Sequence, residues 1–213
     1  MKQRKLQILS ESAVMIALSV VLSLFKISFP FGGSITLLSM LPIILIALRH
    51  GTGYGLISGV IFAVIKLLMG LENFSYIPSW WGYILCTMLD YIIPYGAIGL
   101  AGIFRKKDFL KNEKSNLFLV AFLGVLAACA VRYAAHTLSG VIVWAAVAEM
   151  KGETLNAWLK EVLTYSAWIY SLSYNAAYMV PETVITVIAA PIVVTALDSA
   201  GIKMGKKNKK ENY

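Results

Sequence analysis

The apolar runs of this chain are too long and too numerous for a water-soluble core of its size. Of its 213 residues, 59% are hydrophobic and 14% are charged, whereas soluble domains are about half apolar and about a quarter charged. An α-helix needs about 20 apolar residues to cross a bilayer. We therefore expect an all-α membrane protein, a single domain over residues 1–213 folded as a six-transmembrane-helix bundle. The expected spans are residues 8–27, 34–48, 54–71, 82–104, 117–148 and 174–197.

Two of these spans differ from the usual length. The second is short and contains Pro42. The fifth stays apolar over residues 117–148, which is too long for one vertical span, so it must tilt, protrude or break.

Basic residues predict how the spans are oriented. Of the 19 Lys and Arg residues, 14 lie in residues 1–7, 49–53, 105–116 and 198–213. Loops rich in Lys and Arg stay in the cytoplasm, so we expect both termini to be cytoplasmic, with a lysine-rich tail from about residue 203. The net charge of +8 then reflects orientation in the cell membrane, because no basic stripe with interleaved aromatics exists to bind nucleic acid.

The sequence lacks the patterns of soluble enzymes and metal proteins. Its two cysteines, Cys86 and Cys129, lie in apolar runs without metal-ligand spacing. No Walker A loop, zinc-protease motif or Ser/His/Asp arrangement is visible. A membrane enzyme could use Asp90 and His136 as acid and base, but no paired acids are evident. We expect no metal, no cofactor and no enzymatic activity.

Four ionisable residues fall inside predicted spans: Asp90, Arg132, His136 and Glu182. Each costs about 2.5–3.5 kcal/mol on membrane-insertion scales, so each is a functional candidate by default. Asp90 lies about eight residues into its span. Its presence inside a span has two explanations: a structural ion pair with Arg132, or a carboxylate that binds a cationic ligand.

Aromatic and amide groups accompany these charges. His136 and Trp144 are two steps of four residues apart, which places them on one slowly drifting helical stripe. Tyr170 and Asn175 stand at the start of the last apolar stretch. The Asn amide suits the edge of a heterocycle, although an interhelical hydrogen bond of about 0.6 kcal/mol is the alternative. The set predicts an outward-facing pocket for a small, flat, cationic heterocycle, because desolvated cation–π contacts reach about 2 kcal/mol.

A series of short motifs runs along nearly the whole chain in a specific order. They are the small-xxx-small pair Ala13/Ala17, the segment 29–36 leading to Met40-Leu-Pro42, Leu48-Arg-His-Gly51, Leu89-Asp-Tyr91, Gly99-Leu-Ala-Gly102, Arg132-Tyr-x-x-His136 with Trp144, and Tyr170-x-x-x-x-Asn175. Together they resemble the thiamine-specific substrate-binding subunits (S components) of energy-coupling factor (ECF) transporters.

The resemblance implies an S-component fold and a role in vitamin uptake. The chain would capture thiamine near the outer face of the cell membrane. A transmembrane coupling subunit would dock on Ala13 and Ala17, and two cytoplasmic ATPases would drive reorientation of the chain and release of the vitamin inside.

The resemblance also implies a set of ligand contacts. Asp90 would meet the ligand cation, with Tyr91 beside it. His136 and Trp144 would lie against the aminopyrimidine, and Tyr170 and Asn175 would make polar contacts to that ring. Residues 28–34 would form a lid. Asp90 stands where some members have Glu, so an S component for a related vitamin is an alternative. The residues implied to bind thiamine are Asp90, Tyr91, His136, Trp144, Tyr170, Asn175 and Trp80.

A transporter of another class is the second alternative. A proton-coupled secondary transporter of a cationic vitamin could use Asp90, His136 and Glu182 as a proton relay. It would need no ATPase. Such transporters are commonly built from inverted repeats, and none is visible in this sequence.

Overall fold

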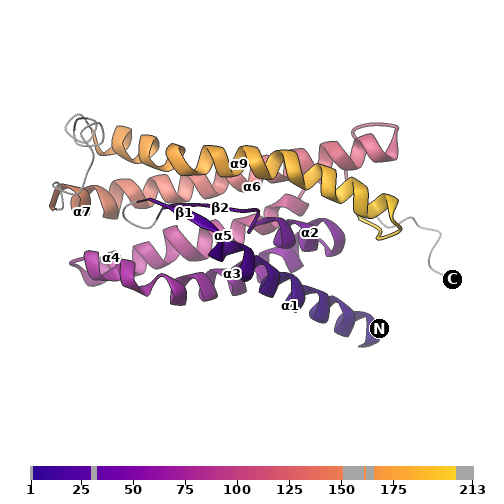
Figure 1. Ribbon diagram of the computed structural model, residues 1–213, viewed down its shortest axis with the longest axis horizontal. Coiled ribbons are helices and arrows are strands. Elements are labelled where there is room, and N and C mark those ends of the chain that lie inside the picture. The colour runs from indigo at the N-terminus through magenta and orange to yellow at the C-terminus, as the bar shows by residue number, and fades with distance from the viewer. Residues whose placement is uncertain (1, 30–32, 151–160, 162–165, 205–213) are drawn as a thin grey trace.

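The computed structural model describes residues 2–29, 33–150, 161 and 166–204, and its helices run side by side in an elongated bundle (Figure 1). Its α-helices are α1 (Lys2–Leu24), α2 (Leu41–His50), α3 (Thr52–Met69), α4 (Trp80–Cys86), α5 (Ile93–Ala97), α6 (Glu113–Ser139), α7 (Ala145–Met150) and α9 (Ala167–Ser199). Shorter 3₁₀ segments cover Leu71–Tyr76 and Ile98–Gly102, and π-helical turns cover Thr87–Ile92 and Gly140–Trp144.

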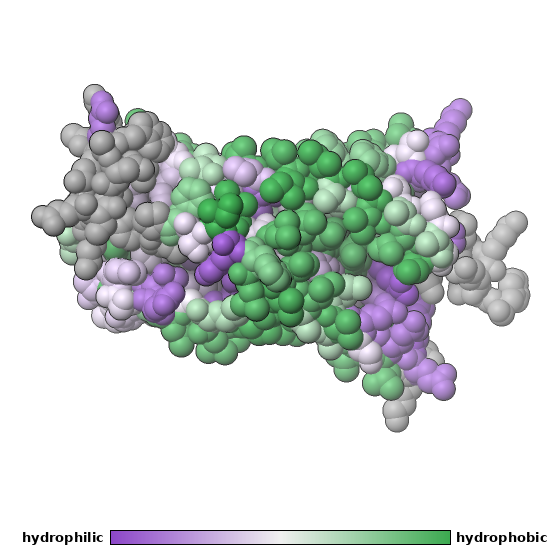
Figure 2. All heavy atoms as spheres, viewed as in Figure 1, coloured by the Kyte–Doolittle hydropathy of each residue, from purple (hydrophilic) through white to green (hydrophobic). Residues whose placement is uncertain are grey.

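Five helical rods in the described residues are long and apolar enough to cross a membrane. They are Gln3–Leu24, Thr52–Met69, Trp80–Gly102, Glu113–Met150 and Ala167–Ser199, whereas α2 is a shorter apolar helix. Hydrophobic side chains cover the middle of the molecule and hydrophilic ones gather toward its ends (Figure 2). Examples that project outward are Ile57, Ile61, Val64 and Leu68 on α3, and Val180, Val184, Ile188 and Ile192 on α9. The predicted all-α membrane fold is confirmed.

The second predicted span begins seven residues later than expected. Residues 34–40 are not helical: Ser34–Thr36 forms strand β2, which pairs antiparallel with β1 (Lys26–Ser28). The physical reason is that β-branched Ile35 and Thr36 suit a strand, and the pairing satisfies backbone groups that a lone extended segment would leave open. Pro42 then lies in the first turn of α2, where its missing N–H costs nothing.

The last two predicted spans are longer in the structure than expected. The fifth continues from Glu113 to Met150 as one rod with a π-helical turn inside it, so the helix does not break. The last helix begins at Ala167 instead of residue 174 because the Ser166 side chain accepts a hydrogen bond from the Trp168 N–H, which caps the helix.

The start of α1 and the end of α9 lie at the same end of the bundle (Figure 1). Near that end, Glu11 of α1 lies 3.1 Å from Arg49 and 2.7 Å from His50 of α2. This arrangement is compatible with termini on one side of a membrane, and the cytoplasmic assignment stays a prediction. The lysine-rich tail lies mostly outside the described residues.

The centre of the bundle depends on close contacts between backbones. α6 packs along α9 (Figure 1) and also against Ile98–Gly102. At Gly124 of α6, a Cβ atom would lie 2.0 Å from the carbonyl oxygen of Ala101, and at Gly99 it would lie 2.1 Å from the Leu56 nitrogen. Since a small residue is needed for helices to approach this closely, these glycines set the spacing of the rods that carry the site.

We predict that Gly124→Ala destabilises the protein, because the added methyl group forces α6 away from a backbone that cannot yield. Overpacking of this kind costs about 1–3 kcal/mol, which thermal unfolding in detergent will measure. Gly53→Ala is the matched control, since nothing lies within 4 Å of its added Cβ. Equal melting temperatures for the two variants would contradict this account of the packing.

Candidate ligand-binding site

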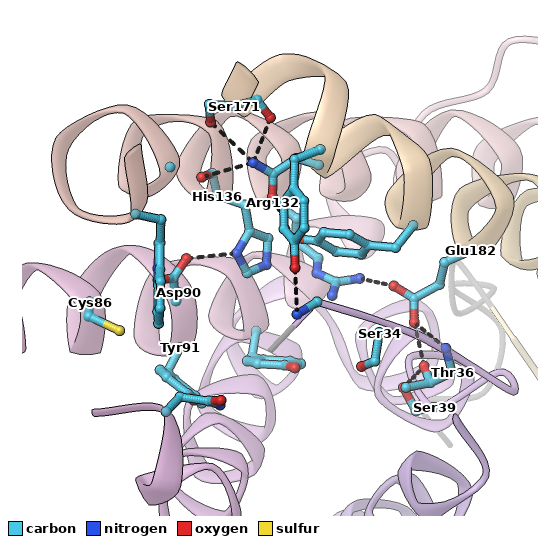
Figure 3. Close-up of a pocket in the computed structure, with 18 of the residues that line it drawn as sticks. Ser34, Thr36, Ser39, Cys86, Asp90, Tyr91, Arg132, His136, Ser171 and Glu182 are labelled. Carbon is cyan, nitrogen blue, oxygen red and sulfur yellow. Dashed lines mark hydrogen bonds and ion pairs between the residues drawn. The ribbon is translucent and has the colours of Figure 1, made fainter. Parts of the chain in front are cut away.

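A hollow opens between the α4–α5 rod, the α6–α7 rod, α9 and the β1–β2 hairpin (Figure 3). It contains about 780 Å³ of space not filled by protein atoms, part of it open to solvent. Its lining is mixed, with aromatic rings, two carboxylates, a guanidinium, an imidazole and two amides. Six of the seven predicted ligand-binding residues line it: Asp90, Tyr91, His136, Trp144, Tyr170 and Asn175.

The Asp90 carboxylate is held by three side chains of the opposite rod. Oδ2 accepts hydrogen bonds from Ser139 Oγ at 2.6 Å and Trp144 Nε1 at 2.7 Å. Oδ1 lies 3.0 Å from His136 Nδ1 (Figure 3), which donates when that nitrogen carries the proton. The alternative of an Asp90–Arg132 ion pair is not what the structure contains.

Two π-helical turns bring these groups together. Asp90 and Tyr91 lie in Thr87–Ile92, and Trp144 ends Gly140–Trp144. A π-turn inserts one extra residue into a helix and occurs often at functional sites. Here Trp144 and Ser139, which are five positions apart, bond the same carboxylate. In a regular α-helix the residues that share a face are three or four positions apart.

Asn175 and Tyr170 form the α9 side of the hollow. Asn175 Nδ2 donates to the Ser171 carbonyl oxygen at 2.8 Å and lies 3.3 Å from that of His136. Its Oδ1 accepts from Tyr178 at 2.5 Å. Tyr170 is buried and stacks on Tyr174 with ring centroids 6.0 Å apart. The amide is thus oriented by protein partners on both of its polar atoms.

Arg132 and Glu182 pair with each other. Arg132 Nη1 lies 3.2 Å from Glu182 Oε2, and both side chains are almost fully buried. Glu182 Oε1 also accepts from the backbone N–H and the hydroxyl of Thr36 (Figure 3). A buried pair is tolerated only when its remaining polar atoms are also bonded, and the hairpin supplies part of that requirement.

One face of α9 holds the β1–β2 hairpin against the hollow. Tyr174, Tyr178 and Glu182 follow one another at steps of four residues, and all three line the hollow. The Tyr174 hydroxyl accepts from Gly33 N–H at 3.2 Å, and Tyr178 lies 6.1 Å from the Phe29 ring. The hairpin is therefore part of the wall. The predicted lid over 28–34 includes residues 30–32, which lie outside the described residues.

Trp80 and the predicted docking pair lie away from this hollow. Trp80 is 74% exposed and does not line it. Ala13 and Ala17 are exposed on α1, one turn apart and on one face. The structure thus brings six of the predicted ligand residues together and leaves Trp80 outside.

Several residues of the site escaped the sequence analysis. Ser139 is fully buried and contacts Asp90, but a serine in an apolar run gives no signal by itself. Thr36 and Ser39 line the hollow because the chain forms a hairpin where a helix was expected. Tyr174 carried a signal, since it stands at four-residue spacing before Tyr178 and Glu182.

Comparisons with known proteins agree with this architecture. A family model described as thiamine transporter protein (Thia_YuaJ) matches residues 9–201. The thiamine transporter ThiT of Bacillus subtilis is 33% identical over 193 residues, which cover 88% of this chain and 90% of that protein. ThiT of Lacticaseibacillus paracasei is 24% identical over 198 residues, covering 91% and 90%. A solved structure of ThiT from Listeria monocytogenes has a TM-score of 0.66 at 23% identity, covering 92% of this chain and 96% of that one.

The structural likeness shows a shared helical fold, and the sequence matches extend across nearly all of it. Both curated relatives are named as transporters. The expectations of a multi-pass membrane protein and of a chain that is not an enzyme are therefore confirmed. By the extent of the family match, the chain belongs to the thiamine transporter protein family.

Proposed function

We propose that this chain is the S component of an ECF transporter and binds thiamine in the hollow around Asp90. In this proposal it captures the vitamin from the outer face of the cell membrane. A transmembrane coupling subunit and two cytoplasmic ATPases deliver the vitamin inward. Family membership and the names of the relatives support thiamine, and the described residues offer a site whose chemistry matches a cationic heterocycle.

The observation that carries the proposal is the Asp90 carboxylate between aromatic groups. Its negative charge is held at the wall of the hollow by Ser139, His136 and Trp144. A thiazolium ring carries a permanent positive charge and presents flat π faces. Opposite charges attract strongly where water is excluded, and the indole of Trp144 adds a cation–π surface.

The polar edge of the aminopyrimidine is assigned to the α9 side of the hollow. Asn175 and Tyr170 line that side, whereas Tyr91 lines the opposite wall beside Asp90. Because Asn175 is already bonded to protein on both polar atoms, the ligand would share or replace one of these bonds. Trp80 has no role in this proposal because it is outside the hollow.

The proton-coupled transporter remains the second candidate. Asp90 and His136 are close enough to exchange a proton. The third member of that relay, Glu182, bonds instead to Arg132 and Thr36. In vesicles that contain only this chain, uptake of thiamine driven by a proton gradient would establish this function, whereas the S-component proposal requires partner subunits and ATP.

We predict that Asp90→Asn weakens thiamine binding by at least about 1.4 kcal/mol, or tenfold, because it removes the charge that faces the cation. Calorimetry on the purified protein will measure the dissociation constant (Kd). Binding of a neutral analogue with the same ring shape should weaken much less. Equal losses for both ligands would mean that Asp90 only supports the fold.

We also predict that binding and transport separate on α1. Ala13→Trp or Ala17→Trp should abolish ATP-dependent uptake by the assembled transporter, because a bulky side chain holds a partner helix away from the small-residue face. Thiamine affinity of the isolated chain should stay unchanged, since neither alanine lines the hollow.

Val184→Trp is the matched control for these α1 variants, since Val184 is exposed on α9 and carries a bulky substitution outside the small-residue face. It should leave uptake intact. If Ala13→Trp lost ligand binding together with uptake, α1 would belong to the binding core and the docking assignment would fail.

A further inference from the structure

The buried ion pair of Arg132 and Glu182 has no part in the recognition of a cation at Asp90. Their side chains are only 5% and 4% exposed. Such pairs contribute little to stability, and replacing them by apolar residues is often neutral or stabilising. Both residues nevertheless line the same hollow as Asp90. Because they line the hollow, we ask which group of a ligand they could contact.

The guanidinium of Arg132 has more donors than its protein partners use. It carries five N–H groups, but its hydrogen bonds with described residues come from Nη1, toward Glu182 and the sulfur of Met40. Its buried Nε has no hydrogen-bond partner among the described residues. Its centre lies 5.3 Å above the Tyr95 ring. Because Nε is fully buried, the donors left for an acceptor on a ligand are those of Nη2, which bonds no described residue.

The surroundings of Arg132 select the kind of acceptor. Glu182 lies beside it and balances its charge. The hydroxyls of Thr36 and Ser39, 2.6 Å apart, complete this side of the hollow. An anionic group such as a phosphate would approach the Glu182 carboxylate as well as the guanidinium. An alcohol avoids that repulsion, and it can accept from Arg132 while donating its own proton to an oxygen nearby.

The arrangement of the hollow gives this subsite a place on the ligand. Asp90 and Glu182 lie on opposite sides of the close-up, with His136 and Arg132 between them (Figure 3). A ligand whose cationic ring meets Asp90 would therefore direct a substituent toward Arg132. Thiamine carries a hydroxyethyl chain on its cationic ring, which ends in such an alcohol.

We propose that Arg132, paired with Glu182, forms a hydroxyl-recognition subsite that donates a hydrogen bond to the alcohol oxygen of the ligand. This inference rests on the proposed function and adds to it a basis for selectivity. The site would favour the free alcohol over both a deoxy analogue and a phosphate ester. Arg132 is then a specificity-determining residue between Asp90 and Glu182 (Figure 3).

The first test compares three ligands on the purified wild-type protein by calorimetry. They are thiamine, its analogue with an ethyl group in place of hydroxyethyl, and its phosphate monoester. We expect the Kd of each of the last two to be about tenfold higher or more. Equal Kd values for thiamine and the deoxy analogue would overturn the subsite while leaving the proposed function intact. If none of the three ligands binds, the proposed function itself fails.

The second test repeats the comparison on the double variant Arg132→Gln/Glu182→Gln, which removes both charges together. We expect it to lose the preference for thiamine over the deoxy analogue and to keep its affinity for the latter. The matched control is Arg49→Gln/Glu11→Gln, which removes a similar pair near the end of the bundle and should keep the preference. Equal weakening of both ligands by the double variant would make Arg132 structural.

Two further outcomes complete the test. If the double variant does not fold, Arg132→Lys retains the positive charge but has fewer donors, and it should still reduce the preference for the alcohol; an unchanged preference would overturn the proposal. Tighter binding of the phosphate ester than of thiamine by the wild-type protein would show an anion subsite instead, and would also overturn it.

Discussion

The Asp90 carboxylate lies among apolar helices, and three side chains of one opposing rod hold it there. A charge within a membrane span costs about 2.5–3.5 kcal/mol, so its donors must be placed accurately. Ser139, His136 and Trp144 supply them from α6 and the turn that follows it. Each of the two rods contains a π-helical turn at this contact, and the same contacts place the Asp90 carboxylate beside an aromatic hollow.

The remaining elements close the hollow around that charge. α9 contributes a face on which the β1–β2 hairpin rests, through Gly33 at one end and Thr36 at the other. Arg132 pairs with Glu182, so among the described residues that line the hollow Asp90 is the carboxylate without a guanidinium partner. The proposed recognition of a cation beside Asp90 and of a hydroxyl group beside Arg132 would then rest on the same packing.

Much of this architecture could be predicted from the sequence, because long apolar runs and isolated charges are strong signals in a membrane protein. The spans, and the proximity of Asp90 to His136 and Trp144, follow from those signals. The hairpin at Ser34–Thr36 could not be predicted, because a short apolar stretch reads equally well as a helix. The Arg132–Glu182 pairing and the exposure of Trp80 depend on how helices distant in the sequence rotate against one another, which periodicity leaves open.

The most direct test of the central claim is a titration of the purified chain with thiamine, in which calorimetry and tryptophan fluorescence measure binding. We predict saturable heat at one site and a quench that Trp144→Phe largely removes, because that indole lines the hollow beside Asp90. Neither riboflavin nor biotin should bind. Absence of heat and quench with thiamine, together with saturable binding of either of those vitamins, would contradict the account.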